Sequence, residues 1–280
     1  QPDGSWSSAR NIGPPLNNTG HNYLNAITTD GTKAFLGGAY GNVNAKDRLY
    51  IVERTADGWD KPKEVKIDNY YNLSNYNSFH ISVDGKVVLL SIEQEDALGL
   101  KDLYVSFQQS DGSYSAPKNL GPQINTAGDE VTPFLAADGK TLYFSTDGRP
   151  GYGRNDIYMT KRLDDSWQRW SRPLNLGPAV NTENWDAYYT LPAKGDFAYF
   201  TSYEDSYGSG DIFRIAIPPE QMPDAVALIK GKVIDAKTNA PIAATVAYES
   251  DSVAQEVAQT NPATGSYQLV ADIGQQLVLL

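Results

Sequence analysis

The stretch "DEVTPFLAADGKTLYFSTDGRPGYGRNDIYMTKR" at residues 129–162 decides the fold. In it a short apolar run is followed by an Asp-Gly pair, an aromatic run, a glycine-containing loop and a third run that starts at Asp156. The same frame returns at residues 185–215 and 78–107, and a weaker copy lies at residues 24–54. Self-similarity of this kind indicates an internal repeat in which each copy is one supersecondary unit.

A second signature stands between the copies and fixes their period. It reads "WSSARNIGPPLNNT" at 6–19, "YSAPKNLGPQINT" at 114–126 and "WSRPLNLGPAVNT" at 170–182, and a degenerate copy at 59–73 keeps its asparagine. The asparagine column recurs at intervals of 53 to 56 residues and consists of Asn17, Asn72, Asn125 and Asn181. A repeat of this length is long enough for four short strands.

Each copy predicts four antiparallel strands, which in the third copy cover 131–137, 141–146, 156–161 and a last strand that begins at Trp170. The Asp-Gly pair between the first two runs favours a tight hairpin turn with positive φ. Four-stranded units repeated at this period are typical of β-propeller blades. We therefore predict an all-β protein, with a β-propeller of four-stranded antiparallel blades in which four repeats are visible.

The sequence leaves the number of blades open. The segment at residues 6–13 corresponds to the outer strand of a blade, and that strand could complete the last repeat, whose third strand ends near Ile217. Four blades would result from such a closure. A ring of five or six blades fits the same sequence if further repeats precede it.

The glycine loop "GRPGYGRND" permits two interpretations, a phosphate cradle or the corner of a repeating sheet. A phosphate loop leads into a helix whose N-terminus supplies N–H donors, whereas here a strand follows. The loop also recurs in place, since a glycine stands three residues before each of Asp102, Asp156 and Asp211. We therefore expect turn glycines, and aspartates that accept backbone hydrogen bonds within the turn.

The repeats resemble the WD40-like propeller repeats of bacterial envelope proteins, most closely OmpA-family proteins of the Bacteroidetes type, which include a type IX secretion component. After the proline-rich "IPPEQMPDAV", the segments "GKVIDAKTNAPI" and "TGSYQL" resemble the carboxypeptidase-regulatory-like fold. The resemblance implies a propeller at 1–217, a linker at 218–227 and a truncated β-sandwich domain at 228–280. The first copy departs from the pattern, because Arg48 stands where the others have aspartate.

The same resemblance implies where the protein acts and with what. It implies a periplasmic or outer-membrane-associated protein whose partners are other envelope or secretion-system proteins. Peptidoglycan would be bound only through an OmpA-like domain, which this sequence does not contain.

Composition excludes several classes of partner and site. The 280 residues carry 23 Lys and Arg against 34 Asp and Glu, a net charge of −11, which argues against nucleic acid as the main partner. The absence of cysteine excludes disulfides and thiolate metal sites. No apolar run approaches the roughly 20 residues of a membrane helix, so we predict no transmembrane segment.

Paired carboxylates are the strongest candidates for enzyme chemistry. Glu130 and Asp186 hold equivalent places before neighbouring innermost strands, and Trp185 stands beside Asp186. Two carboxylates act as acid and base in glycosidases, so Glu130 and Asp186 converging on the ring axis, together with His80, would form such a site. The alternative is that the carboxylates satisfy loop backbone at the rim and that His80 is a polar residue lining the axis.

Arg149 and Arg154 in the glycine loop are candidate ligands for an anion or an acidic partner, because arginine forks suit carboxylates. The alternative is a solvated loop that balances the acidic surface. The serine motif of α/β-hydrolases is absent, and the two histidines lack metal-ligand spacing. We therefore predict no catalytic residue, no metal and no cofactor.

Two functions from different classes follow from these observations. The first is a non-enzymatic cell-envelope scaffold, a protein-interaction module in a secretion or envelope-anchoring assembly. The alternative is a carbohydrate-binding or glycan-cleaving propeller that uses the axial carboxylates.

Overall fold

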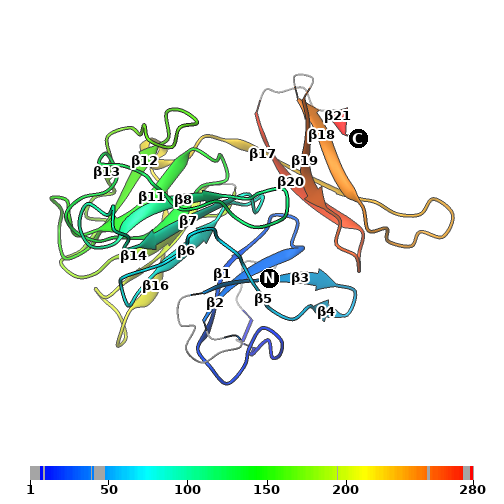
Figure 1. The fold of residues 1–280 in the computed structure, drawn as a ribbon, viewed down its shortest axis with the longest axis horizontal. Helices are drawn as coiled ribbons and strands as arrows, with labels where there is room; N and C mark the ends of the chain where they lie inside the picture. The colour runs from blue at the N-terminus through cyan, green and yellow to red at the C-terminus, as the bar shows by residue number, and fades with distance from the viewer. Residues whose placement is uncertain are drawn as a thin grey trace.

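The computed structural model describes residues 7–8, 10–38, 40, 48–193, 195–250, 253–273 and 278–279. Within these residues the chain is built of β-strands and loops, with a single short 3-10 helix, η1 (Pro219–Gln221). Four antiparallel sheets follow one another along the chain as the blades of a propeller (Figure 1). The predicted fold class is confirmed.

The strands of each blade are consecutive in sequence, and neighbouring strands are antiparallel. Blade 1 contains β1 (Asn22–Ile27), β2 (Lys33–Gly38), β3 (Leu49–Thr55), β4 (Gly58–Trp59) and β5 (Lys63–Glu64). Blade 2 contains β6 (Ser78–Ile81), β7 (Val87–Ile92), β8 (Asp102–Phe107) and β9 (Lys118–Asn119). Blade 3 contains β10 (Glu130–Leu135), β11 (Thr141–Thr146), β12 (Asp156–Lys161) and β13 (Leu174–Asn175). Blade 4 contains β14 (Ala187–Thr190), β15 (Phe197–Ser202) and β16 (Asp211–Ala216).

The turn glycines predicted from the repeat have the expected backbone conformation in all four blades. The three Asp-Gly turns place their glycines at positive φ, namely 69° at Gly31, 76° at Gly85 and 64° at Gly139, and Gly195, which follows a lysine in the same column, has a φ of 68°. A residue without a Cβ adopts this conformation without strain, which explains the glycine in these hairpins. The turns therefore set the register of the first two strands of each blade.

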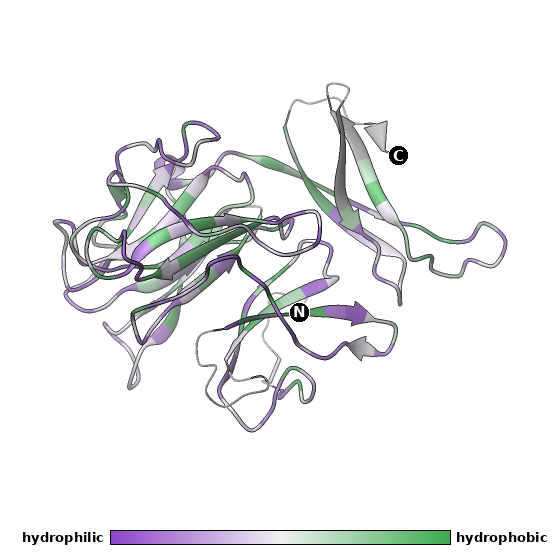
Figure 2. Cartoon of the chain, viewed as in Figure 1, coloured by the Kyte–Doolittle hydropathy of each residue, from purple (hydrophilic) through white to green (hydrophobic). Residues whose placement is uncertain are grey.

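The core consists of layers between neighbouring blades. One cluster joins blades 2 and 3, a second joins blades 3 and 4, and a third joins blades 1 and 2. Figure 2 shows the hydrophobic residues mainly on the strands and the hydrophilic ones mainly on the loops. The aromatic column at the start of each outer strand packs as predicted, since Tyr114 and Trp170 are buried. Trp6, from the same column, lies outside the described residues.

Blade 4 differs from blades 2 and 3 at its outer edge. Among the described residues, β16 pairs with β15 and with no further strand. The segment at residues 10–19 lies instead on blade 1, where Leu16 packs with Leu36 and Tyr50. The innermost strands of blades 1 to 4 contact one another in sequence order, and β1 and β14 share no contact of that extent. The closure that the sequence left open, in which the start of the chain completes the last blade, is therefore not seen among the described residues.

The C-terminal strands form two small sheets beside the blades (Figure 1). In one, β17 (Val226–Lys232) pairs with β20 (Ser266–Asp272), and in the other, β18 (Thr245–Ser250) pairs with β19 (Val253–Gln259) and β21 (Val278–Leu279). A hydrogen bond from the Gln259 N–H to Asp30 Oδ2, 2.9 Å long, ties them to blade 1. The division into a propeller, a linker and a β-sandwich domain stays a prediction.

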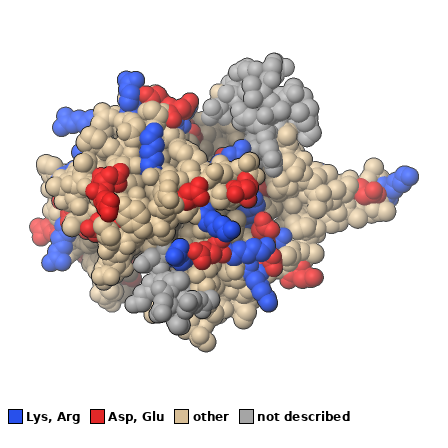
Figure 3. Space-filling view, in the orientation of Figure 1, with Lys and Arg blue, Asp and Glu red and all other residues tan. Residues whose placement is uncertain are grey.

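The surface has no single dominant charge on the face that Figure 3 displays, where basic and acidic side chains are interspersed. Within the part of the chain that the structure covers, no helix has the length and hydropathy of a membrane span.

Candidate functional site

A pocket opens on the rim where blades 3 and 4 meet. We call it the rim pocket. It is lined by Asp147, Arg154, Asn155, Asn184, Trp185 and Tyr203. Its volume of about 570 Å³ lies in the range of small-molecule sites.

Backbone contacts between two loops position these side chains. Asn155 and Trp185 form a parallel bridge, and the Asp186 N–H donates to the Asn155 carbonyl at 3.0 Å. The Arg154 N–H donates to the Asn184 carbonyl at 3.1 Å. The loops approach so closely at Gly153 that a Cβ there would lie 2.2 Å from the Thr182 carbonyl oxygen. The glycine of the repeat is therefore needed for the junction of two blades rather than for a ligand.

Trp185 and Tyr203 form an apolar wall beside the polar groups of the rim pocket, and Tyr188 lies next to Trp185 outside the lining. The Trp185 ring stands edge-on to Tyr188 and Tyr203, with centroid distances of 5.7 and 6.1 Å. Tyr188 has a left-handed backbone, φ 57°, at an irregularity of β14, and its side chain is exposed. Thr132, in the same column of β10, also has a positive φ, 48°, at a register irregularity, so this backbone conformation belongs to the repeat. Tyr188 lines the open face of blade 4 and not the rim pocket.

The polar lining carries both charges and two amides. Asp147 is exposed, and its Oδ1 accepts a 2.7 Å hydrogen bond from the Asp129 N–H. The Asn184 Nδ2 donates to Glu204 Oε2 at 2.9 Å, and the Arg154 side chain is exposed. The pocket therefore offers donors and acceptors around one aromatic wall.

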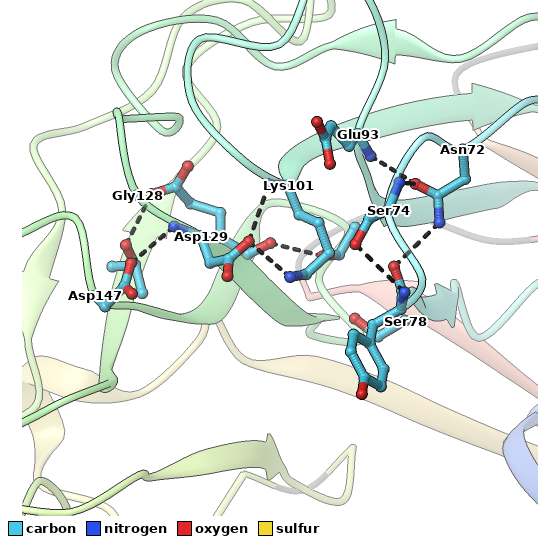
Figure 4. A network of polar contacts seen from close by, with 12 residues as sticks. Asn72, Ser74, Ser78, Glu93, Lys101, Gly128, Asp129 and Asp147 are labelled. Atoms are coloured by element: carbon cyan, nitrogen blue, oxygen red, sulfur yellow. Dashed lines mark hydrogen bonds and ion pairs between the residues drawn. The ribbon is translucent and has the colours of Figure 1, made fainter.

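The corresponding junction of blades 2 and 3 shows how the repeat has changed. There Lys101 and Asp129 occupy the columns of Asn155 and Trp185, and they form a 2.6 Å ion pair with side chains only 12% and 24% exposed (Figure 4). An ion pair of this kind fills the junction. Its replacement by an amide and an indole leaves the rim open between blades 3 and 4.

Glu130 does not line the rim pocket. Its side chain is fully buried and accepts hydrogen bonds from the Thr126 N–H at 2.9 Å, the Thr126 hydroxyl at 2.6 Å and the Thr146 hydroxyl at 2.7 Å. Burial raises the pKa of Glu130, and these hydrogen bonds oppose the rise. The carboxyl group thus joins the loop before β10 to the end of β11.

Asp186 has the same place one blade further on. Its Oδ2 accepts hydrogen bonds from the Thr182 N–H at 2.6 Å and the Thr182 hydroxyl at 2.9 Å, and the side chain is fully buried. The expected convergence of Glu130 and Asp186 on an open axial pocket is therefore not what the structure shows. The alternative weighed for them, that they satisfy loop backbone, agrees with these contacts.

His80 lies between the innermost strands of blades 2 and 3. The ring is buried at 4.7 Å from Phe134, and its Nε2 is 3.2 Å from the Leu135 carbonyl oxygen. Burial of the imidazole lowers the pKa of His80 from 6.5 to about 4. His80 is therefore neutral at pH 7, and it does not line the rim pocket.

The lowered pKa of His80 predicts that the folded protein loses stability in acid, and that replacing His80 with glutamine removes this part of the loss. Between pH 6.5 and about 4 the unfolded chain takes up a proton at His80 and the folded chain does not, so stability falls as the pH drops. The loss at pH 4 amounts to about 3 kcal/mol at most. His80→Gln keeps a donor toward Leu135 and cannot ionise. We expect thermal melts at pH 7 and pH 4.5 to show a smaller acid loss for the variant, and equal losses would contradict the assignment.

The two arginines of the glycine loop have different roles. Arg149 donates from Nη2 to the Gln123 carbonyl at 2.7 Å and to the Ile124 carbonyl at 2.9 Å, so it joins its loop to the preceding one. Arg154 lines the rim pocket together with Trp185. Of the six candidate site residues named from the sequence, Arg154 and Trp185 lie together in one pocket.

Sequence reasoning missed most of the rim pocket. Asp147, Asn155, Asn184 and Tyr203 were not singled out, because each lies in a loop whose partner is set by blade packing. The signal that could have found them is the change of residue type within a column, from Lys101 and Asp129 to Asn155 and Trp185. The described residues contain no group of three or more histidine, aspartate or glutamate side chains placed to hold a metal.

The comparisons with known proteins identify no family for the chain. No protein-family model and no curated protein sequence matches the chain. The chain is similar to the Pseudomonas aeruginosa periplasmic gluconolactonase PpgL, with 13% identity, a TM-score of 0.41, and coverage of 91% of this chain and 71% of that one. It is also similar to a putative 6-phosphogluconolactonase from Bacteroides fragilis, with 15% identity, a TM-score of 0.31, and coverage of 90% and 92%. An ancestral GH74 enzyme matches with 12% identity, a TM-score of 0.28, and coverage of 90% and 42%.

These comparisons overturn two expectations. The non-enzymatic envelope scaffold was inferred from the resemblance of the repeats to envelope proteins, and the absence of enzyme activity from the missing catalytic motifs. The three propeller-like structures are, by their titles, two lactonases and a GH74 enzyme, and none of the three is a secretion or scaffold component. Since one fold hosts many functions, the repeats do not support a scaffold, and function has to be argued from the pocket.

Proposed function

We propose that this protein is a carbohydrate-binding propeller whose ligand occupies the rim pocket. The observation that supports the proposal is the aromatic wall of Trp185 and Tyr203 beside the exposed side chains of Asp147, Arg154 and Asn184. A sugar ring has an apolar C–H face and a rim of hydroxyls, so it needs both kinds of surface side by side. Aromatic rings that are apolar on the face and polar at the edge suit such a ligand.

The polar groups of the pocket narrow the ligand class. Asp147 accepts hydrogen bonds and the guanidinium of Arg154 donates them, so a neutral hydroxyl-rich sugar can be held from two sides. Arg154 also suits a sugar acid, because a guanidinium pairs with a carboxylate in bidentate fashion. The ligand class is therefore a neutral or acidic monosaccharide unit, free or at the end of a glycan.

The test is binding to a panel of monosaccharides, sugar acids and oligosaccharides, followed by calorimetry on the compounds that bind. We expect Trp185→Ala to weaken binding at least tenfold, because loss of a stacking aromatic typically costs more than about 1.4 kcal/mol at a binding site. Tyr207→Ala is the matched control, since Tyr207 is a fully exposed aromatic outside the pocket. Equal affinity in both variants, or no ligand in the panel, would sink the proposal.

The same panel should be assayed for turnover. Gluconolactone and 6-phosphogluconolactone belong in it because the structures of similar fold carry those names. Ring opening measured by acid release, and lost in Asp147→Asn, would identify the pocket as an active site. Binding without turnover would identify a lectin-like propeller.

Location and domain boundaries belong to the proposal as well. The resemblance of the repeats to OmpA-family envelope proteins supports a periplasmic or outer-membrane-associated protein, in the setting of envelope or secretion-system partners. The resemblance of the tail supports a propeller at 1–217, a linker at 218–227 and a β-sandwich domain at 228–280. Cell fractionation and limited proteolysis test these two points.

A further inference from the structure

The outer edge of blade 4 lacks the cover that the same edge has in blades 2 and 3. Leu103 in β8 and Ile157 in β12 are 0% exposed, whereas Ile212, in the same column of β16, is 78% exposed. Leu103 and Ile157 pack against the next blade, so the exposure of Ile212 marks an uncovered face of blade 4. On its other side from β15, β16 pairs with no strand of the described residues, and the backbone N–H and C=O groups of such an edge are a site for pairing with another chain. The edge therefore needs an occupant, and the other blades show which one fits.

In blades 2 and 3 the occupant is an asparagine-bearing segment with a fixed set of contacts. Asn125 accepts from the Leu103 N–H at 2.8 Å and donates to the Leu103 carbonyl at 3.0 Å. Asn181 does the same to Ile157, at 2.7 and 3.0 Å. One amide side chain thus satisfies both backbone groups at the start of the third strand.

A second asparagine in each segment completes the contact. Asn119 donates to Asp102 Oδ2 at 2.8 Å in blade 2, and Asn175 donates to Asp156 Oδ2 at 2.7 Å in blade 3. Asp211 holds this position in blade 4, where its Oδ2 accepts from the Tyr207 N–H at 2.7 Å. The edge of β16 therefore presents the same acceptor to a segment of the same type.

The start of the chain holds such a segment in the right conformation. The Asn17 N–H donates to the Gly13 carbonyl at 2.9 Å, as Asn125 does to Gly121 and Asn181 to Gly177. The Gly13 N–H donates to Asn11 Oδ1 at 2.8 Å, and the φ of Gly13 is 76°, close to the 85° of Gly121. The Asn17 side chain makes no hydrogen bond to the described residues. It is free to bind an edge.

A whole face of blade 4 is open beside the edge. This face borders a cavity of about 860 Å³ lined by Tyr188, Thr190, Tyr199, Phe200, Thr201, Ile212 and Arg214. In blades 2 and 3 nearly all strand residues are buried on both faces, because a neighbouring blade packs on each side. A single strand would leave this face exposed, so the occupant has to bring the side of a blade with it.

We propose that the open edge and face of blade 4 bind the blade 1 end of a second copy of this chain. Residues 10–19 of one copy add to β16 of the other as the missing fourth strand, and blade 1 covers the open face. Within one chain these residues lie on blade 1 and, among the described residues, do not pair with β16, so a second copy has a segment of the right type to offer to this edge. β9 pairs with β8, and β13 pairs with β12, in the same register. Applied to β16, this register would place Asn11 opposite Phe213 and Arg10 opposite Arg214.

Cysteine crosslinking tests this register directly, because the chain contains no cysteine. Two single variants, Arg10→Cys and Arg214→Cys, are prepared with tags of different mass, mixed and oxidised. We expect a disulfide-linked heterodimer in the mixture. The substitutions also remove the pair of like charges that this register brings together. Lys237→Cys, an exposed position in the C-terminal region, replaces Arg214→Cys in the control for random oxidation.

Each result decides the proposal. A heterodimer that exceeds the control, with sedimentation of the unmodified chain at twice the monomer mass, supports it. An internal disulfide in the double variant at monomer mass would show that the ring closes within one chain and would overturn it. A crosslink no stronger than the control, or a monomer at every concentration, would also overturn it.

A side-chain substitution gives an independent readout. We expect Asn17→Ala to weaken the self-association at least tenfold, because the edge of β16 loses the amide that pairs with Ile212. The melting temperature of the dilute monomer should stay unchanged, since the Asn17 side chain is not bonded to the described residues. An unchanged dissociation constant would contradict the role of this asparagine.

Discussion

Replacing Glu130 with alanine is expected to lower the free energy of unfolding by about 3–5 kcal/mol, one of the two largest effects of any single substitution we consider. The carboxyl group accepts three hydrogen bonds, from the Thr126 N–H and from the Thr126 and Thr146 hydroxyls, and it is fully buried. Each buried donor left without a partner costs about 1–3 kcal/mol. Urea unfolding followed by tryptophan fluorescence measures the loss.

Glu130→Gln is the matched control for this prediction. The amide oxygen can still accept from Thr126, but the NH₂ group is a donor that faces donors, so we expect a loss of intermediate size. A variant Glu130→Ala of unchanged stability that had lost carbohydrate binding would contradict the structural role. It would also restore the carboxylate as a candidate for ligand contact.

Replacing Trp170 with alanine is expected to cost about 3–5 kcal/mol, the usual range for removing a buried tryptophan. Trp170 lies in the cluster between blades 2 and 3, its Nε1 donates to the Trp167 carbonyl at 3.0 Å, and the two indole centroids are 5.9 Å apart. Its removal leaves a cavity and an unpaired carbonyl. Thermal and urea unfolding monitored by circular dichroism measure the change.

Trp185→Ala is the matched control for Trp170→Ala, because it removes a tryptophan that is not buried in the core. Trp185 stands on the rim and is only partly buried, so its loss is expected to cost about 1 kcal/mol or less. Equal destabilisation by Trp170→Ala and Trp185→Ala would show that the rim aromatic supports the core. It would thereby weaken the assignment of the rim pocket as a ligand site.

The strands of each blade were predictable because their signals are local and repeated. The third copy shows this best, where the runs predicted at 141–146 and 156–161 are β11 and β12 in the structure. The glycine loop was predictable for the same reason, and Asp156 accepts from the Tyr152 N–H at 2.7 Å and the Gly153 N–H at 3.1 Å, as a turn aspartate should. Turn chemistry acts over a few residues, so sequence suffices to predict it.

The candidate site was predictable only in part, because burial depends on the neighbouring blade. Glu130 and Trp185 stand one residue apart in their columns, yet the first is enclosed by threonines and the second lines an open pocket. Sequence alone ranked the carboxylates above the indole, since paired acids are a familiar catalytic pattern. Chain position does not tell which side of a rim a loop faces.

By itself, the sequence determined the blade as a unit: its strands, its Asp-Gly turns, its aspartate-capped loops and its period. These follow from hydrogen bonds and side-chain alternation within about fifty residues. The tertiary structure alone decided which junction between blades stays open and which edge of the propeller stays uncovered. Those outcomes depend on contacts between blades, where an ion pair such as Lys101–Asp129 fills one junction and its absence leaves the next one open.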